Sequence, residues 1–116
     1  MKIKNAKIKN VTTGTDPKKR VCVSLEFHYS THFKIVVFKL ENPVELANFK
    51  KLLEFTETTD FESLEGKIIR VAEHEDVVKA FGDPIEDKFI DITNTIMMDL
   101  VKEMSISELL KEYPET

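Results

Sequence analysis

Val21-Cys22-Val23-Ser24-Leu25-Glu26-Phe27-His28-Tyr29 alternates apolar and polar side chains along its whole length. A period of two residues is typical of a β-strand, because successive side chains point to opposite faces of a sheet. Ser30-Thr31 predicts a turn, and the apolar positions of 33–40 predict a second strand that pairs with the first in an antiparallel hairpin. The later part of 33–40 is apolar at successive positions, so we expect this strand to be central or covered on both faces.

Before this hairpin, the apolar residues Ile3, Ala6, Ile8 and Val11 alternate with two slips of parity. Such slips in a strand predict a bulge or a bend. Residues 13–17 contain glycine and proline and predict the loop that follows.

After the hairpin, the sequence predicts a helix over 42–56. Asn42 suits the N-cap, Pro43 the first turn, and Glu45 the carboxylate position of a capping box. A shorter turn follows, with Asp60 as its cap and Gly66 as its end.

The second half of the chain predicts strands at 68–71 and 77–81, with 73–76 as the turn between them. A break at 82–84 precedes a short extended piece at 89–92. We then expect a helix that begins at Thr93 or Asn94 and contains Ile96, Met97, Leu100, Val101 and Met104. Ser105 and Glu108 form a second capping box, which predicts that the helix restarts there and continues to Tyr113.

These elements predict one α+β domain over 1–116, a length that suits a single core. We expect a curled antiparallel sheet of about five strands, with a helix between the third and fourth strands and a C-terminal helical region. This order is that of an OB-type barrel. A flatter sheet with helices on one face has the same order, and the sequence leaves the two alternatives open.

The composition predicts a cytoplasmic protein without a membrane span. Hydrophobic residues make up 41% of the chain and charged residues 33%, and no apolar run reaches the roughly 20 residues of a spanning helix. The first residues lack the apolar segment of a secretion signal. Cys22 is the single cysteine, which excludes an internal disulfide and a four-cysteine zinc site and suits a reducing compartment.

Charge is distributed unevenly along the chain. Up to Leu40 there are nine basic and two acidic residues, and after it eight basic and nineteen acidic ones. Such asymmetry is typical of a surface for a charged partner, or of two halves that attract each other within one fold. The candidate partner-binding carboxylates are Glu73, Glu75, Asp76, Asp83, Glu86, Asp87 and Asp91. The candidate nucleic-acid-binding residues are Lys2, Lys4, Lys7, Lys9, Lys18, Lys19, Arg20 and Lys34.

Catalytic and metal chemistry find little support in the sequence. His28 and His32 flank a predicted hairpin turn, and zinc would need a third ligand, so we expect no metal site. Cys22 is interpreted as a structural cysteine. The three glycines cannot form a phosphate-binding loop, so we expect no nucleotide cofactor and no enzyme activity.

Aromatic residues lie near basic ones in the hairpin, as in proteins that stack the bases of single strands. Most of these rings share the parity of the apolar residues, so we assign them to the core. They are Phe27, Tyr29, Phe33 and Phe38, with Lys34 and Lys39 nearby.

The segments Phe61-Glu62-Ser63-Leu64-Glu65-Gly66-Lys67-Ile68-Ile69-Arg70-Val71 and Lys79-Ala80-Phe81-Gly82-Asp83-Pro84-Ile85-Glu86-Asp87-Lys88-Phe89 cover about a fifth of the chain. Together they resemble a pattern in small uncharacterised proteins from phages and prophages of Gram-positive bacteria. Phe89 stands where tryptophan is usual in that pattern, and Asp83 where histidine is more common. The resemblance implies a phage or mobile-element setting, in which small acidic proteins often antagonise host machinery.

The sequence therefore favours a non-catalytic binding protein that contacts a host protein through an acidic face. An acidic face attracts basic partners, many of which bind nucleic acid. The alternative is a single-stranded nucleic-acid binder that uses the basic N-terminal sheet. The oligomeric state and the identity of the partner are left open.

Overall fold

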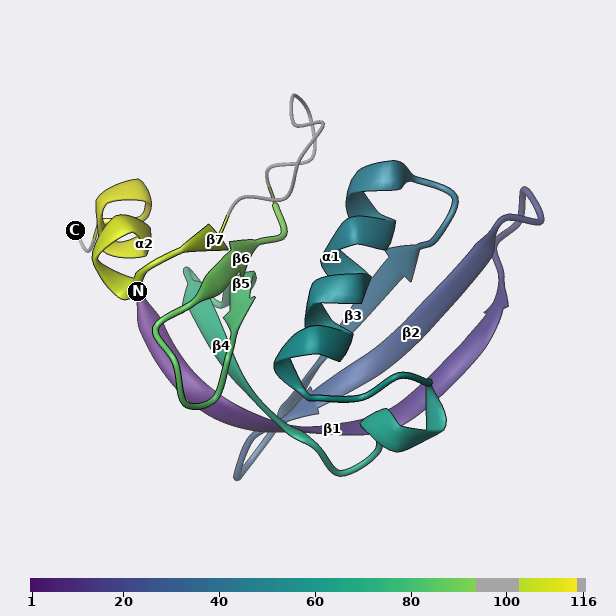
Figure 1. Cartoon of the computed structure of the whole chain (residues 1–116), viewed down its shortest axis with the longest axis horizontal. Helices are drawn as coiled ribbons and strands as arrows, with labels where there is room; N and C mark the ends of the chain where they lie inside the picture. The colour runs from purple at the N-terminus through teal and green to yellow at the C-terminus, as the bar shows by residue number, and fades with distance from the viewer. Residues whose placement is uncertain (94–102, 115–116) are drawn as a thin grey trace.

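The long first strand, β1 (Lys2–Thr15), lies in the middle of a seven-stranded antiparallel sheet in the computed structural model (Figure 1). The structure describes residues 1–93 and 103–114. Within them the strands are ordered β3-β2-β1-β4-β5-β6-β7. The other elements are β2 (Val21–His28), β3 (Phe33–Lys39), α1 (Pro43–Phe55), the 3₁₀ turn η1 (Glu62–Leu64), β4 (Ile68–His74), β5 (Val77–Gly82), β6 (Phe89–Asp91), β7 (Glu103–Met104) and α2 (Ile106–Glu112).

A bulge bends β1 between Lys9 and Thr12, where the register with β2 shifts and Asn10 has a φ of 53°. The first half of β1 pairs with β4, and its second half extends along β2. The strand therefore belongs to both halves of the curved sheet. The bulge predicted from the parity slip before Val11 is confirmed, whereas the slip between Ile3 and Ala6 lies in a stretch that pairs with β4 in continuous register.

The β2–β3 hairpin forms as predicted, but β3 is not central. Val23, Leu25 and Phe27 of β2 are buried, in agreement with the alternation. β3 instead forms one edge of the sheet, and Phe33, with 47% of its surface exposed, lies outside the core to which the sequence assigned it. One face of β3 has no covering layer in the described part of the chain. The alternation of side chains along a strand does not show whether its second face is covered.

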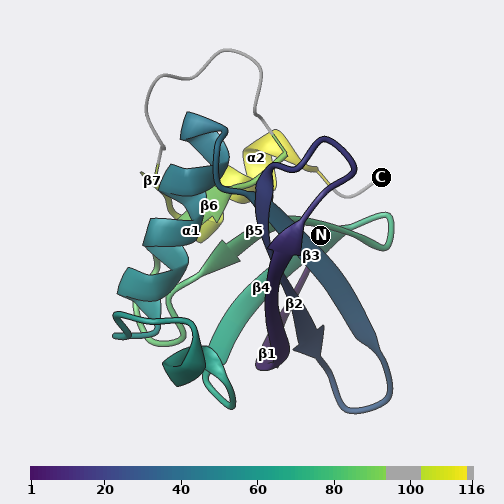
Figure 2. The ribbon, with the colours of Figure 1, turned by 90° about the vertical axis from the view of Figure 1, so that its right-hand side faces the viewer.

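α1 begins as predicted and packs into the concave side of the sheet (Figures 1 and 2). The Asn42 side chain accepts hydrogen bonds from the Val44 and Glu45 amides. The carboxylate of Glu45 does not close a capping box. It accepts instead from the backbone N–H of Lys39 at 3.3 Å, because the end of β3 lies next to the first turn of α1.

The predicted turn at 73–76 is shorter in the structure. β4 continues to His74, so that Glu73 belongs to a strand, and Glu75 and Asp76 alone make the turn. Both turn residues have positive φ, as in the tight turns that join antiparallel strands. The predicted strand at 77–81 and the short extended piece near 89–92 are present as β5 and β6.

Part of the predicted helix from Thr93 or Asn94 to Met104 lies outside the described residues. This part includes Ile96, Met97, Leu100 and Val101. At its end Met104 belongs to β7, which pairs with β6, so the prediction is wrong for this residue. The restart at Ser105 is confirmed, because Ser105 and Glu108 make both bonds of a capping box at the start of α2.

Two apolar clusters lie on opposite faces of the sheet. Phe81 of β5 packs with Phe38 and α1 on the concave face. Its neighbour Ala80 packs with Leu109 of α2 on the opposite, convex face. Helices therefore cover both faces, unlike the flat alternative predicted. The sheet is open: in the described ranges β3 is paired with β2 alone, and the second half of β5 pairs with β6. The sheet has seven strands instead of about five, because β6 and β7 extend it.

Candidate functional site

The predicted acidic residues do not form one face. Glu75 and Asp76 lie in the β4–β5 turn, whereas Asp83, Glu86 and Asp87 lie beyond the other end of β5. The six residues of β5 separate the two groups, which is about 20 Å of extended chain. Asp91 lies at the end of β6.

Several of these carboxylates hold local structure together. Asp83 accepts hydrogen bonds from the Ile85 and Glu86 amides and so closes the β5–β6 loop. Asp87 accepts from the backbone N–H of Ile106 and joins this loop to α2. Asp91 accepts from the hydroxyl of Tyr113 at 2.6 Å and from the amide and hydroxyl of Thr93. These three carboxylates therefore already bind groups of the same chain.

Glu73 is buried and is therefore not available on the surface. Its Oε1 lies 3.4 Å from the ammonium of Lys4, which also lies over the ring of Tyr29. Burial, with the nearby Glu73 carboxylate, raises the pKa of Tyr29 far above its ordinary value. Lys4, Tyr29 and Glu73 thus form a polar group in which Glu73 is buried and the other two are half-buried. The register of β4 with β5 shifts between Ala72 and Glu73.

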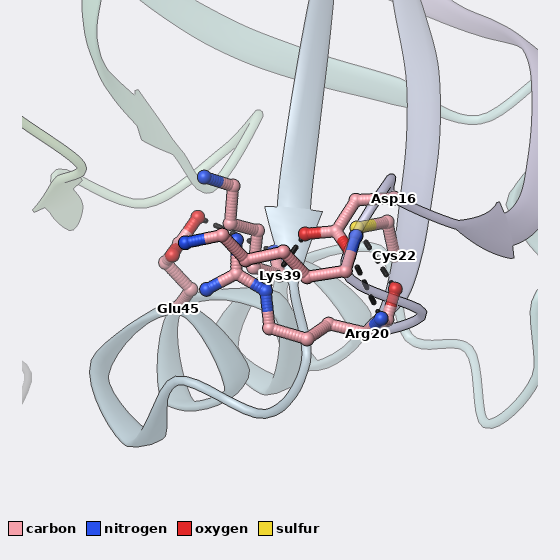
Figure 3. A network of polar contacts seen from close by, with 6 residues as sticks. Asp16, Arg20, Cys22, Lys39 and Glu45 are labelled. Carbon is pink, nitrogen blue, oxygen red and sulfur yellow. Dashed lines mark hydrogen bonds and ion pairs between the residues drawn. The ribbon is translucent and has the colours of Figure 1, made fainter.

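The predicted basic residues differ in their availability. Lys4 contacts Glu73, and Arg20 donates through Nε to Asp16 at 2.7 Å (Figure 3). The backbone N–H of Arg20, with its side chain, holds the pKa of Asp16 below its ordinary value. Lys34 donates to the backbone oxygen of Asp76 at 3.0 Å. The exposed members of the set are Lys2, Lys7, Lys9, Lys18 and Lys19.

The strand register brings part of this basic set to the outer face of β1, β2 and β3, opposite α1. Lys7 pairs with His28, which pairs with Phe33, so these side chains form one row across the face. Lys9, Glu26 and Ile35 form the next row. The carboxylate of Glu26 accepts from Asn10 and contacts His28 at 2.6 Å, and these bonds lower the pKa of Glu26. We call this surface the outer face.

An exposed apolar row follows β3 along the edge of the outer face. Phe33, Ile35 and Val37 are 47%, 62% and 48% exposed, and alternate positions of a strand share one face. The ring of Phe33 stacks on His28 at 4.9 Å between centroids. The sequence of this strand is apolar on both faces, and this pattern was the available signal for the row. The pattern predicts burial, whereas in the structure these side chains are exposed.

The same three residues carry the free backbone groups of this edge. The amide of Leu40 donates to the Val21 oxygen and that of Tyr29 to the His32 oxygen. Bonded pairs of antiparallel strands recur at every second residue, so Lys34, Val36 and Phe38 face β2. Phe33, Ile35 and Val37 then direct their N–H and C=O groups away from β2, and no partner strand meets them in the described ranges. The next edge N–H, that of Lys39, is bound by Glu45.

Two shallow cavities flank this strand. One, of about 350 Å³, lies between residues 34–37 of β3 and residues 76–78 at the start of β5, with Ile92 beside them. We call it the seam. The other, of about 290 Å³, lies between residues 12–16 of β1 and Val37, with Cys22 and Ser24 between them. Val37 lines both cavities, so both open along β3.

The fold does not bring together the candidate metal-binding and catalytic residues, namely the two histidines of the hairpin and the cysteine. His28 contacts Glu26 and Phe33, whereas the ring of His32 lies against Tyr29. The thiol of Cys22 lies 3.5 Å from the Arg20 carbonyl oxygen. Among residues 1–93 and 103–114, no three side chains of His, Cys, Asp or Glu are grouped to hold a metal ion.

Comparison of the chain with protein-family models, with curated proteins and with solved structures finds no match. In the part of the chain that the structure describes, no helix has the length and apolar character needed to cross a membrane. The outer face and the seam are therefore the features on which a functional proposal can rest.

Proposed function

We propose that this chain is a non-catalytic binding protein that acts by contact with another protein through the exposed row Phe33, Ile35 and Val37. The observation that carries the proposal is that these three residues combine exposed apolar side chains with free backbone groups on an edge strand. Natural edges are usually protected by charge, proline or a covering element, because an open apolar edge pairs with other chains. An edge of this kind is typical of a recognition surface.

The structure favours β3 over the acidic surface as the place of contact. Glu73 is buried, and Asp83, Asp87 and Asp91 bind groups of the chain itself. The remaining carboxylates, Glu75, Asp76 and Glu86, lie at two separate ends of β5. They suit attraction of a basic partner at long range better than a continuous docking face.

The setting proposed is a phage or mobile element, and the partner a host protein that this chain antagonises by occupying its surface. The resemblance over 61–89 supports the setting. A cytoplasmic location is part of the proposal and is supported by the unpaired Cys22, whose thiol is half-buried. We also propose an OB-like architecture, supported by the β1–β4 pairing and by the place of α1 between β3 and β4.

The test compares capture of partners from a host lysate by the wild-type protein and by three variants. Ile35→Lys places a charge in the row, Ile85→Lys is the matched control at an apolar side chain that is 87% exposed elsewhere, and Glu86→Lys tests the acidic surface. We expect a partner that wild type and both other variants retain and that Ile35→Lys loses. Equal capture by Ile35→Lys, with loss by Glu86→Lys, would return the proposal to the acidic surface.

A second candidate function is the binding of single-stranded nucleic acid to the outer face. The observation that favours it is the row of Lys7, His28 and Phe33, which places an exposed ring and a cation in one row across the outer face. Bases stack on such rings while cations contact phosphates. We expect retention of an oligothymidylate at low salt to fall steeply as salt is added. Phe33→Ala should weaken it and Phe61→Ala, at an exposed ring on another surface, should not; lack of retention by the wild type at low salt would remove this candidate.

A further inference from the structure

The seam has the features of a place in the sheet where one more strand could lie. The inner faces of Val36, Val78 and Ile92 pack against the main core and give the seam an apolar floor. On one side it is bounded by the free N–H and C=O groups of β3. On the other side it is bounded by the first residues of β5, ahead of the part that pairs with β6.

One hydrogen bond connects the two sides of the seam, β3 and the start of β5. The ammonium of Lys34 reaches across the seam to the backbone oxygen of Asp76 at 3.0 Å. A lysine side chain lies between the two backbones where directly paired strands would stand about 4.8 Å apart. At this point the two sides are joined by a lysine side chain and not by backbone hydrogen bonds. An added strand next to β3 would displace this contact.

The basic charge near one end of β3 selects the charge of the occupant. Lys39 is exposed at the end of the strand and lies beside the β1–β2 connection, which carries Lys18, Lys19 and Arg20 (Figure 3). Arg20 is paired with Asp16. In the described ranges, the ammonium groups of Lys18, Lys19 and Lys39 have no carboxylate within ion-pair distance. The Glu45 carboxylate, which accepts from the Lys39 amide, offsets one of these charges. The three cations still exceed it, so an incoming carboxylate at this end would be attracted.

From these observations we propose that the partner presents an extended peptide segment, apolar at alternate positions and acidic at the end beside Lys39, which adds a strand to the free edge of β3 within the seam. This inference rests on the proposed function and names the chemistry of its partner. The backbone of the segment pairs with Phe33, Ile35 and Val37, and its inward side chains cover Val36, Val78 and Ile92. Strand addition of this kind takes affinity from main-chain hydrogen bonds and specificity from alternate side chains.

A peptide fits this site better than a second copy of the chain. The edge strand of a second copy carries a whole sheet behind it, and residues 76–78 stand on the far side of the seam. A single strand has no neighbour of its own to clash with them. Self-association is therefore the alternative outcome of the test.

The probes are three fluorescein-labelled peptides that share the core Thr-Val-Thr-Val-Thr-Val. The first carries three glutamates after this core, the second carries them before it, and the third carries three lysines after it. Because parallel and antiparallel addition place opposite ends beside Lys39, the two acidic probes cover both directions. By fluorescence anisotropy we expect one acidic probe to bind at least about tenfold more tightly than the lysine probe. In protein NMR spectra, its addition should shift the amides of 33–37 and 76–78.

Two protein variants test the backbone and the charge separately. Ile35→Pro removes an N–H that points away from β2, so the β2–β3 ladder loses no hydrogen bond. We expect it to weaken binding of the acidic probe about tenfold or more, while Ile35→Val, which retains the N–H, binds as the wild type does. Lys39→Glu should reduce the preference for the acidic over the lysine probe, because Lys18 and Lys19 remain, and Lys111→Glu on α2 should leave it unchanged.

A modified probe removes dependence on the folding of Ile35→Pro. N-methylation of alternate amides in the acidic probe should abolish binding for one of the two alternate sets, namely the set that faces β3. Equal binding of acidic and lysine probes, or binding that tolerates methylation of either set, overturns the inference. Concentration-dependent dimerisation that Ile35→Lys abolishes would overturn it in favour of a second copy. If the probes fail while Ile35→Lys still loses its captured partner, the segment proposed here is wrong and the proposed function stands.

Discussion

Gly82 lies at the end of β5, at a point where no side chain fits. A β-carbon there would lie 2.6 Å from the backbone oxygen of Lys88 and 2.6 Å from Cδ1 of Phe89. Gly82→Ala therefore forces β5 and the following loop apart, because a backbone oxygen cannot rotate away. We expect the free energy of unfolding in urea to fall by about 2 kcal/mol, as for overpacked cores. Gly14→Ala, whose β-carbon meets nothing within 4 Å, is the control. Similar losses for both would contradict the steric explanation.

Tyr113 supplies a residue-scale prediction about pH. Burial, with the hydrogen bond to Asp91, raises the pKa of the Tyr113 hydroxyl from 10.0 to about 12. The neutral form is thus favoured in the folded state, and this stabilisation is complete below pH 10.0 and lost as the pH rises through about 12. The pKa of Tyr29 is raised as well. We expect an ultraviolet titration to show no tyrosinate at pH 10.0. Half-ionisation of one tyrosine at this pH would show that its pKa is not raised and would contradict the prediction.

Tyr113→Phe separates the two tyrosines in the same titration. The variant should lose the ionisation near pH 12 and retain the later one of Tyr29. Its stability should also decline less between pH 10.0 and about 12 than that of the wild type, because only the contribution of Tyr29 remains.

At the scale of the element, α1 depends on its N-cap. Asn42 accepts hydrogen bonds from the Val44 amide at 3.0 Å and from the Glu45 amide at 3.2 Å. Asn42→Ala leaves both amides without this acceptor, and we expect a loss of about 1 kcal/mol in thermal or urea unfolding. Asn5→Ala, at an exposed position of β1, should change the stability by less than about 0.5 kcal/mol. A loss for Asn5→Ala as large as for Asn42→Ala would show that the cap is not the cause.

At the scale of the whole molecule, the two faces of the sheet carry separate apolar clusters. Leu109 anchors α2 to the cluster on the convex face, which contains Ala80 and Phe89. Leu109→Ala should lower the free energy of unfolding by about 2–5 kcal/mol, as for truncation of a buried leucine. Its effect should be local at first. In hydrogen exchange we expect the amides of α2 to lose protection before those of β2, which packs in the other cluster.

Leu110→Ala is the matched control for this experiment, since Leu110 is the neighbour of Leu109 in the same helix and is 43% exposed. It should leave both the stability and the order of exchange nearly unchanged. Simultaneous loss of protection in α2 and β2 of the Leu109 variant would show that the two clusters unfold as one unit.

Predictions from the sequence succeeded where the cause is local. The parity slip between Ile8 and Val11 indicated a bulge that lies within the same strand. Asn42 and Ser105 cap the helices that begin directly after them. Glu45 shows the limit of this reasoning, because its carboxylate met the Lys39 amide, a group brought there by the turn between β3 and α1.

The candidate site lay beyond this limit. The apolar residues of β3 were visible in the sequence, but their exposure depends on the lack of a covering layer over one face of the strand in the described ranges. The burial of Glu73 likewise depends on Lys4, which is 69 positions away along the chain. Charge counts along the chain could not show that the acidic residues would lie at two ends of β5 or bind their own loops.

The sequence by itself determined the α+β character, the β2–β3 hairpin, the bend in β1 and both helix caps, because each follows from side-chain alternation or from hydrogen bonds between near neighbours. Only the tertiary structure decided which strand lies at the edge, which face of it is bare and which carboxylates are buried. These properties depend on which distant segments come together, and the periodicity of one strand does not specify what covers its second face.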